Sequence, residues 1–358
     1  MSFVKVYILS IYNDVDTFNM ATDTLFNENE RKELNFVGCT NCGCVQLHNL
    51  YNPSDIYNET MVVYKGSQFS KHDNLLNEFI IKNNNWSKDI LEIGGSFGVL
   101  AKLIIEKYKQ YNSNVNYKIL EFDIEKYPTN ENIKYISGNC EKFNYMNTDT
   151  IIMSHVFEHL YKPRDFVKKI SESDVRNVFI SIPDMENLIN KNNDINNLNI
   201  CHTYYIDTNF IKYIFNYYGY ELKDIYYFVK NINQNNNLEY KNVKLLDNIK
   251  FFYMTMKNNI NNIIINEPFY ICPSGNYGKF IYNYLNEQTK NNLLGFLDSC
   301  MYKIGKRLEG TNKYIYKKEK IMNYDKINIL LVAGKYNDEI KDELINYNKN
   351  INLIYLDN

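Results

Sequence analysis

The sequence lacks a long apolar run, an excess of charge of one sign and a dense set of cysteines. Its longest apolar stretches, such as VFISIP and INILLVA, are far too short to span a bilayer. The 40 basic and 42 acidic residues give a net charge of -2, so no general attraction draws the chain to nucleic acid or to an anionic membrane. Seven cysteines in 358 residues exclude a disulfide scaffold.

The N-terminal stretch MSFVKVYILSIYND also lacks the length and the cleavage site of a secretory signal. We therefore expect a cytoplasmic protein with a small-molecule substrate and with no membrane or nucleic-acid partner. A chain of 358 residues is too long for one ordinary hydrophobic core, so two or three domains are expected. Nothing in the composition indicates the oligomeric state.

The stretch KDILEIGGSFGVLAKLI, residues 88–104, predicts a strand, a glycine turn and a helix. The run ILEI suits a strand that is buried on both faces, and VLAKLI repeats apolar residues at helical spacing. Gly94, Gly95 and Gly98 lie between them, where the chain must turn sharply and a ligand can approach the backbone.

Three kinds of ligand compete for this turn. A phosphate-binding P-loop needs Lys and then Ser or Thr after its last glycine, but Val99 and Leu100 follow here. A dinucleotide turn needs the pattern G-x-G-x-x-G, but Ser96 takes its second glycine position. An acidic strand end followed by G-x-G-x-G, which this chain matches with Ser96 in place of the middle glycine, resembles the S-adenosylmethionine loop of class I methyltransferases. That resemblance implies cofactor contacts from Glu92, Gly94, Gly95, Ser96 and Gly98.

Acidic residues end the next predicted strand, NYKILEFD. A nucleoside site of this kind uses an acid roughly 20 to 30 residues after the turn to hold the ribose hydroxyls. Glu121 and Asp123 share one face of the strand, and Asp123, nearer the strand end, is the preferred ligand. The later turn SGNCEKF stands where these enzymes bind adenine, which implies contacts from Asn139 and from the Cys140 backbone.

The most specific pattern is DTIIMSHVFEHLYKPRDFVKKI, residues 149–170. It is very similar to the S-H-V-L-E-H-L stretch of class I methyltransferases. The resemblance implies that Ser154 and His155 face the cofactor and substrate, while Glu158 and His159 fix the loop. The alternation of strands and helices predicts an α/β fold, a Rossmann-like doubly wound sheet with its ligand across the carboxyl ends of the strands.

The chain divides by its patterns into three segments. Residues 1–72 form a small cysteine-containing domain, residues 73–235 the S-adenosylmethionine domain, and residues 236–358 a second Rossmann-like domain. The last segment repeats strand, glycine turn and helix in PFYICPSGNYGKFIYNYLNEQ. Backbone amides and a positive charge in this turn could meet a substrate diphosphate, through Gly275, Asn276, Gly278 and Lys279.

Cys39 and Cys42 have the spacing of a zinc knuckle. A structural zinc site takes four ligands, and Cys44 and His48 are the only nearby candidates to complete one. Reduced, partly buried thiols are the alternative interpretation.

Nearly end to end, the chain resembles the three-domain sugar C-methyltransferases of deoxysugar biosynthesis. The segment YKGSQFSKH is similar to their cofactor-covering segment, which implies cofactor contacts from Tyr64 and Ser67. The resemblance also implies a nucleotide-linked keto sugar as the substrate.

The chain departs from this family in two places. The first cysteine pair is missing, which leaves the zinc unsupported, and the Tyr-His-Glu-His catalytic string is replaced by residues 199–202, of which only His202 matches. His202 is therefore the predicted base, with Tyr204 or His155 polarising the substrate oxygen. C-methylation and O-methylation both stay open. A catalytically silent binding protein, favoured by the altered string, and a nicotinamide oxidoreductase are the alternatives.

Overall fold

The computed structural model describes residues 9–11, 34–39, 42–48, 50, 71–83, 87–125, 127, 131–189, 198, 201–224, 227–231, 239–301, 303–308, 311–334 and 337–356. The chain divides into two units, each of which is described by itself. The central unit comprises Lys65–Asp184 and Thr203–Lys241. The composite unit comprises Met1–Tyr64, Met185–His202 and Asn242–Asn358.

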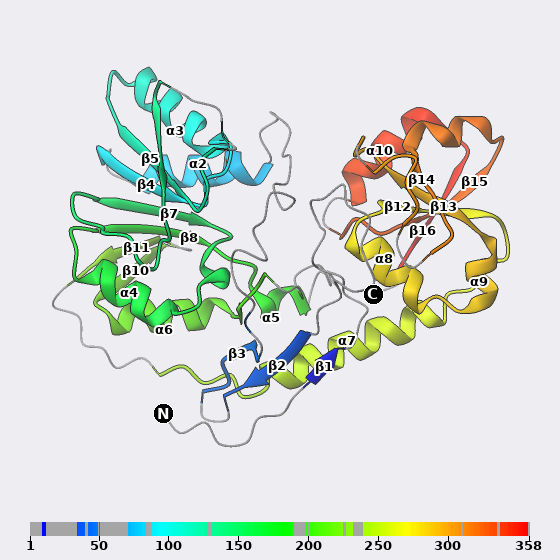
Figure 1. Cartoon of the computed structure of the whole chain (residues 1–358), viewed down its shortest axis with the longest axis horizontal. Helices are drawn as coiled ribbons and strands as arrows, with labels where there is room; N and C mark the ends of the chain where they lie inside the picture. Colours follow the sequence, from blue (N-terminus) through cyan, green and yellow to red (C-terminus); the bar gives the residue numbers. More distant parts are fainter. Residues whose placement is uncertain are drawn as a thin grey trace. The chain divides into compact units, whose positions relative to one another are not determined.

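A seven-stranded sheet forms the middle of the central unit (Figure 1). Its strands follow the order β10 (Tyr220–Asp224), β11 (Tyr227–Lys230), β8 (Asn177–Ser181), β7 (Thr150–Ser154), β4 (Asp89–Ile93), β5 (Asn116–Glu121) and β6 (Ile133–Ser137). Strands β4 to β8 are parallel, and β11 is antiparallel to both of its neighbours. This order, with the last strand antiparallel inside the sheet, is that of the class I methyltransferase fold, so the predicted α/β doubly wound sheet is confirmed.

The carboxyl ends of the inner strands lie level with one another. Ile93 of β4 pairs with Leu120 of β5 and with Met153 of β7. The loops that leave these three strands therefore emerge at one edge of the sheet, where ligands bind in open α/β folds.

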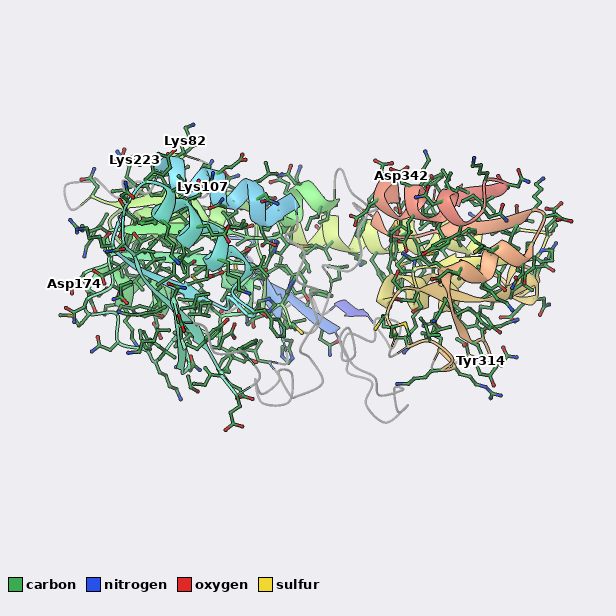
Figure 2. The ribbon with its side chains drawn as sticks, turned by 90° about the horizontal axis from the view of Figure 1, so that it is seen from above. Lys82, Lys107, Asp174, Lys223, Tyr314 and Asp342 are labelled. Carbon is green, nitrogen blue, oxygen red and sulfur yellow. The ribbon has the colours of Figure 1, made fainter. Side chains whose placement is uncertain are left out.

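Helices cover both faces of this sheet (Figure 1). Helices α2 (Lys71–Asn83) and α3 (Val99–Gln110) bury their apolar stripes on one face, while α4 (Pro163–Ser171) and α6 (Thr208–Tyr217) lie on the other. Lys82, in the last turn of α2, projects at the rim of the unit (Figure 2), and Lys107 stands in the last turn of α3. Positive charge at a helix C-terminus interacts favourably with the helix dipole.

The composite unit contains a five-stranded parallel sheet of order β14 (Ile315–Lys317), β13 (Leu293–Asp298), β12 (Phe269–Cys272), β15 (Ile327–Leu331) and β16 (Ile351–Tyr355). Helix α10 (Asn337–Tyr347) and the 3-10 helix η6 (Lys318–Asn323) pack on one face. Helices α7 (Leu245–Asn261) and α8 (Asn276–Tyr284) pack together through Tyr253 and Phe280, and α9 (Glu287–Asn292) leads into β13. The predicted second Rossmann-like sheet is confirmed.

A small antiparallel sheet of β1 (Leu9–Ile11), β2 (Leu34–Gly38) and β3 (Val45–Leu47) belongs to the same unit. It contacts the start of α7: a Cβ at Gly38 would lie 3.0 Å from Leu246 Cδ2, and the Asn242 N–H donates to the Cys42 carbonyl at 2.8 Å. The division at residues 72 and 235 stays a prediction. Among the described helices, none is both long enough and apolar enough to cross a lipid bilayer.

Candidate active site

The glycine turn of the central unit joins β4 to α3. Gly94 and Gly98 have φ values of 71 and 67, in the left-handed region that favours glycine. Ser96 also lies there, with φ 49. Its N–H donates to Glu121 Oε1 at 2.6 Å, and its carbonyl accepts from the Tyr135 hydroxyl at 2.9 Å. The two neighbouring strands therefore hold the serine in a backbone conformation that glycine adopts more easily.

Glu92 lies beneath this turn and is only 4% exposed. Its Oε2 accepts a hydrogen bond of 2.9 Å from the Tyr117 hydroxyl. Burial, followed by the charge of Glu92, raises the pKa of Tyr117, so its phenol stays protonated and continues to donate. A Cβ at Gly95 would stand 2.7 Å from Glu92 Cδ, so a side chain at this position would have to displace the buried carboxyl group.

The two predicted ribose ligands have different surroundings. Glu121 is the last residue of β5 and contacts the glycine turn through the Ser96 N–H. Asp123 lies two residues beyond the strand, is exposed, and accepts the Glu125 N–H at 3.0 Å. Glu121 is thus the acid that adjoins the turn, although ribose binding by either residue stays a prediction.

Three aromatic side chains border the same turn, and the sequence analysis missed them. Phe97 meets Tyr127 edge to face with ring centroids 5.4 Å apart, and Tyr127 stacks on Tyr135, also at 5.4 Å. Burial, followed by the Glu121 charge, raises the pKa of Tyr127 to about 12, so this ring stays neutral at physiological pH. Because the chain has 33 tyrosines, nothing in the sequence set Tyr127 or Tyr135 apart from the others.

The predicted adenine ligands lie in the turn after β6. The Gly138 N–H donates to the Glu121 carbonyl at 2.8 Å, which places this turn beside the end of β5. Asn139 Oδ1 accepts the N–H two residues on at 2.8 Å, and the Cys140 carbonyl accepts from the Tyr145 hydroxyl at 2.6 Å. Burial and then the neighbouring Glu141 raise the pKa of the Cys140 thiol to about 12. Contact of either residue with adenine stays a prediction.

The loop after β7 packs directly on the glycine turn. A Cβ at Gly94 would lie 2.6 Å from Val156 Cγ2, so the two loops meet without room for a further methyl group. His155 has φ 55, and its N–H donates to the Ser181 carbonyl at 2.8 Å. A left-handed backbone at a residue other than glycine costs about 1 to 3 kcal/mol and occurs most often at functional sites. Both predicted motifs therefore meet at the carboxyl edge of the sheet.

Polar side chains surround His155. Its own side chain is 43% exposed, and its Nδ1 lies 3.6 Å from Oε1 of Glu158, which is 1% exposed. The same Oε1 lies 3.9 Å from His159 Nε2. From α2, His72 places its ring centroid 5.2 Å from that of His155, and its Nε2 lies 3.1 Å from Ser154 Oγ.

The sequence analysis did not single out His72. It is the last residue of YKGSQFSKH, the segment selected for Tyr64 and Ser67. Those two predicted cofactor ligands lie outside the described residues.

The predicted base, His202, precedes a residue that is tied to the loop after β7. The Thr203 N–H donates to the Glu158 carbonyl at 2.9 Å. The Tyr204 hydroxyl donates to a backbone carbonyl of the central unit, that of Tyr161, at 3.5 Å. His202 itself is the last residue of the middle segment of the composite unit, and its side chain is buried. The roles of His202 and Tyr204 stay predictions.

The predicted diphosphate ligands lie around the turn from β12 into α8. Among the described residues, no heavy atom stands within 4 Å of a Cβ placed at Gly275, and α8 begins at Asn276. A Cβ at Gly278 would lie 2.4 Å from the Pro273 carbonyl oxygen, so this glycine is required by close packing of the helix on the turn. Lys279 is 2% exposed, which places its charge inside the unit. Diphosphate binding here stays a prediction.

Asp298, at the end of β13, is a buried carboxylate that the sequence analysis missed. It accepts from Ser274 Oγ at 2.5 Å and from the Cys300 N–H at 2.9 Å, and Lys303 Nζ lies 3.4 Å away. Burial alone would raise the pKa of Asp298, but Lys303 and these hydrogen bonds outweigh burial and lower it. The ionised carboxylate thereby ties β13 to the turn before α8.

Cys39 and Cys42 lie in the connection between β2 and β3. The Gly43 N–H donates to the Cys39 carbonyl at 2.7 Å, and the Cys39 N–H donates to the Cys44 carbonyl at 2.9 Å. Burial, and less strongly the Cys39 thiol, raise the pKa of Cys42, although a backbone hydrogen bond at Cys44 opposes them. Within the described part of the chain, these cysteines and His48 do not form a group of three metal ligands. Zinc binding by Cys39 and Cys42 stays a prediction.

No protein-family model and no curated protein matches the chain. Among solved structures, human N-acetylserotonin methyltransferase in complex with S-adenosylmethionine matches at 14% identity and a TM-score of 0.33, over 45% of this chain and 55% of that one. The YcgJ protein of Bacillus subtilis matches at 14% identity and a TM-score of 0.33, over 42% of this chain and 70% of YcgJ. Coclaurine N-methyltransferase, bound to N-methylheliamine and S-adenosylhomocysteine, matches at 18% identity and a TM-score of 0.26, over 30% of this chain and 33% of that enzyme.

The matches thus span about half of the human enzyme and a third of coclaurine N-methyltransferase. All three TM-scores lie below 0.5. The class of fold therefore rests on the strand order of the central sheet.

Proposed function

We propose that the chain is an S-adenosylmethionine-dependent methyltransferase that acts on a nucleotide-linked deoxy or keto sugar. One observation carries the methyltransferase assignment: the glycine turn, the Glu121 carboxylate and the His155 loop meet at one edge of a sheet with the class I strand order. The sugar nucleotide is supported by the sequence resemblance alone.

The donor set at this edge suits the cofactor. Glu121 uses one carboxylate oxygen for the Ser96 N–H, and a carboxylate can accept further hydrogen bonds from ribose hydroxyls. The small residues of the turn allow a nucleoside to approach the backbone closely. When bound, the cofactor supplies an electrophilic methyl group. Methyl transfer then requires a nucleophile held in line and a base to remove its proton, for which His202 is the candidate.

Calorimetric titration of the full chain with S-adenosylmethionine and S-adenosylhomocysteine tests the first part. We expect micromolar binding of both, with NAD as the control that does not bind. Absence of binding to folded protein overturns the proposal, and binding of NAD instead favours an oxidoreductase. A screen of nucleotide sugars for a mass gain of one methyl group tests the second part. Cofactor binding without turnover of any of them would favour the silent binding protein.

A matched pair of variants tests the ribose ligand. Glu121→Gln keeps an oxygen for the Ser96 N–H but loses the charge, and a hydrogen bond to a charged group contributes about 1.5 to 3 kcal/mol. We expect affinity for S-adenosylhomocysteine to fall roughly 10 to 100-fold. Asp123→Asn should leave the affinity nearly unchanged, because Asp123 is exposed and caps its own turn. The opposite result would assign the ribose to Asp123.

The base is tested separately, by His202→Ala. We expect this variant to lose turnover while keeping its affinity for S-adenosylmethionine. An active variant would rule out His202 as the base.

A further inference from the structure

The histidine cluster of the central unit, formed by His72, Ser154, His155, Glu158 and His159, draws on three elements. His72 comes from α2, Ser154 ends β7, and Glu158 and His159 belong to the 3-10 helix η3 (Phe157–His159). From the neighbouring β8, the Ser181 carbonyl accepts the His155 N–H at 2.8 Å. The cluster adjoins the glycine turn through Val156.

Glu158 faces one of the two ring nitrogens of His155. An ionised carboxylate can only accept hydrogen bonds, and burial of its charge is costly unless proton donors face it. Glu158 is 1% exposed, and the nitrogen of His155 that faces its Oε1 is Nδ1, at 3.6 Å. A neutral imidazole has one N–H and one acceptor nitrogen, so a proton on Nδ1 leaves Nε2 as the acceptor.

The rest of the cluster holds the ring in this orientation. The His155 backbone is fixed at φ 55 by its hydrogen bond to β8. The His72 ring lies beside it, tilted by 47°, and is itself anchored to Ser154 Oγ. Because Nδ1 faces a buried carboxylate while 43% of the side chain is exposed, the accessible edge of the ring is the one that carries Nε2.

We infer that His155 presents Nε2 as a hydrogen-bond acceptor to a hydroxyl group of the methyl acceptor, with Glu158 as the positioning residue that fixes the tautomer. The sequence analysis expected the reverse polarity, in which His155 polarises a substrate oxygen. The inference rests on the proposed methyl transfer at this edge, and His202 keeps its predicted role as the base. An acceptor nitrogen here favours a substrate with a hydroxyl beside the methylated atom over one with a bare carbonyl there.

Nuclear magnetic resonance of ring-15N-labelled histidine in the full chain tests the tautomer. The chain has five histidines, so single substitutions assign every ring signal. In the neutral ring, which we would observe at about pH 8.5, we expect His155 to carry its proton on Nδ1.

Variants of Glu158 test the cause. Glu158→Met removes the acceptor at similar volume and should shift the ratio of Nδ1–H to Nε2–H by roughly tenfold or more toward Nε2–H. Glu158→Gln keeps an acceptor oxygen and should retain Nδ1–H. His159→Gln removes the imidazole whose Nε2 lies 3.9 Å from the same Oε1 and, as the matched control, should leave the His155 ratio unchanged.

An Nε2–H tautomer in the wild-type protein overturns the inference without any variant. An unchanged ratio in folded Glu158→Met overturns the role of Glu158. Calorimetry with S-adenosylhomocysteine on the same samples separates the two proposals. A protein that fails to bind it refutes the proposed function, whereas one that binds it but carries Nε2–H on His155 refutes the inference alone.

Discussion

Replacement of Tyr117 by phenylalanine tests the buried carboxylate under the glycine turn. The substitution keeps the ring, which is 2% exposed in the core between β5 and α3, and removes only the hydroxyl that donates to Glu92. Glu92 is 4% exposed, so water does not freely replace the lost donor. A hydrogen bond to a charged group contributes about 1.5 to 3 kcal/mol, and we expect the free energy of unfolding of the central unit to fall by this amount.

Urea unfolding followed by tryptophan fluorescence measures the effect. Trp86 is the single tryptophan of the chain and stands three positions before β4 in the sequence, so the emission has one source. The midpoint should fall while the slope with urea concentration stays the same, because the surface exposed on unfolding does not change. Tyr111→Phe is the control: this side chain is 64% exposed, and its loss of a hydroxyl should change stability by less than about 0.5 kcal/mol. Equal midpoints for Tyr117→Phe and wild type would refute the reasoning.

Three further outcomes are expected. Gly94→Ala should abolish binding of S-adenosylhomocysteine, because its methyl group would lie 2.6 Å from Val156 Cγ2 in a backbone with φ 71. Adding Val156→Ala should restore part of the affinity. If calorimetry finds no restored affinity in the double variant, the steric clash with Val156 is not the cause. Asp298, whose pKa is lowered, stabilises the composite unit above its unfolded pKa of about 3.9, and this contribution is lost as the pH falls through the folded value. Asp298→Asn should therefore flatten acid unfolding below about pH 4 in circular dichroism, and an unchanged slope would contradict its ion pair with Lys303. Iodoacetamide at about pH 8 should leave Cys140 unmodified in the native protein, because burial raises the pKa of its thiol to about 12. The same reagent should modify Cys140 in urea. Modification of Cys140 in the native protein, detected by mass spectrometry, would contradict its burial.

The central sheet was predictable because local patterns and the global fold agree there. Short apolar runs such as ILEI alternate with helices of regular apolar spacing, and parallel strands bring their carboxyl ends to one edge. The meeting of the Gly94 turn with the His155 loop follows from that rule, although the contact through Val156 does not.

Other parts of the site depend on tertiary packing, which one sequence does not encode locally. Which of Glu121 and Asp123 adjoins the glycine turn depends on the residue at which β5 ends, and the sequence does not mark that residue. His72 joins the histidine cluster only because α2 packs against the sheet. Lys279 and Gly278 are predicted ligand residues by type, and the structure adds that Lys279 is buried and that Gly278 packs closely on the Pro273 carbonyl. Residue type and spacing do not distinguish these causes.

The contact of the β2–β3 hairpin with α7 also sets an order of events during synthesis. Gly38 and Leu246 are roughly 200 positions apart, and a ribosome that adds about 5 to 20 residues per second needs about 10 to 40 s to make the second after the first. During that interval the hairpin has its own turn and strand hydrogen bonds but no helix to pack on, while the chain of the central unit emerges in full. The composite unit is therefore completed last, and a chain cut short before α7 would leave the β2–β3 hairpin without the helix on which it packs.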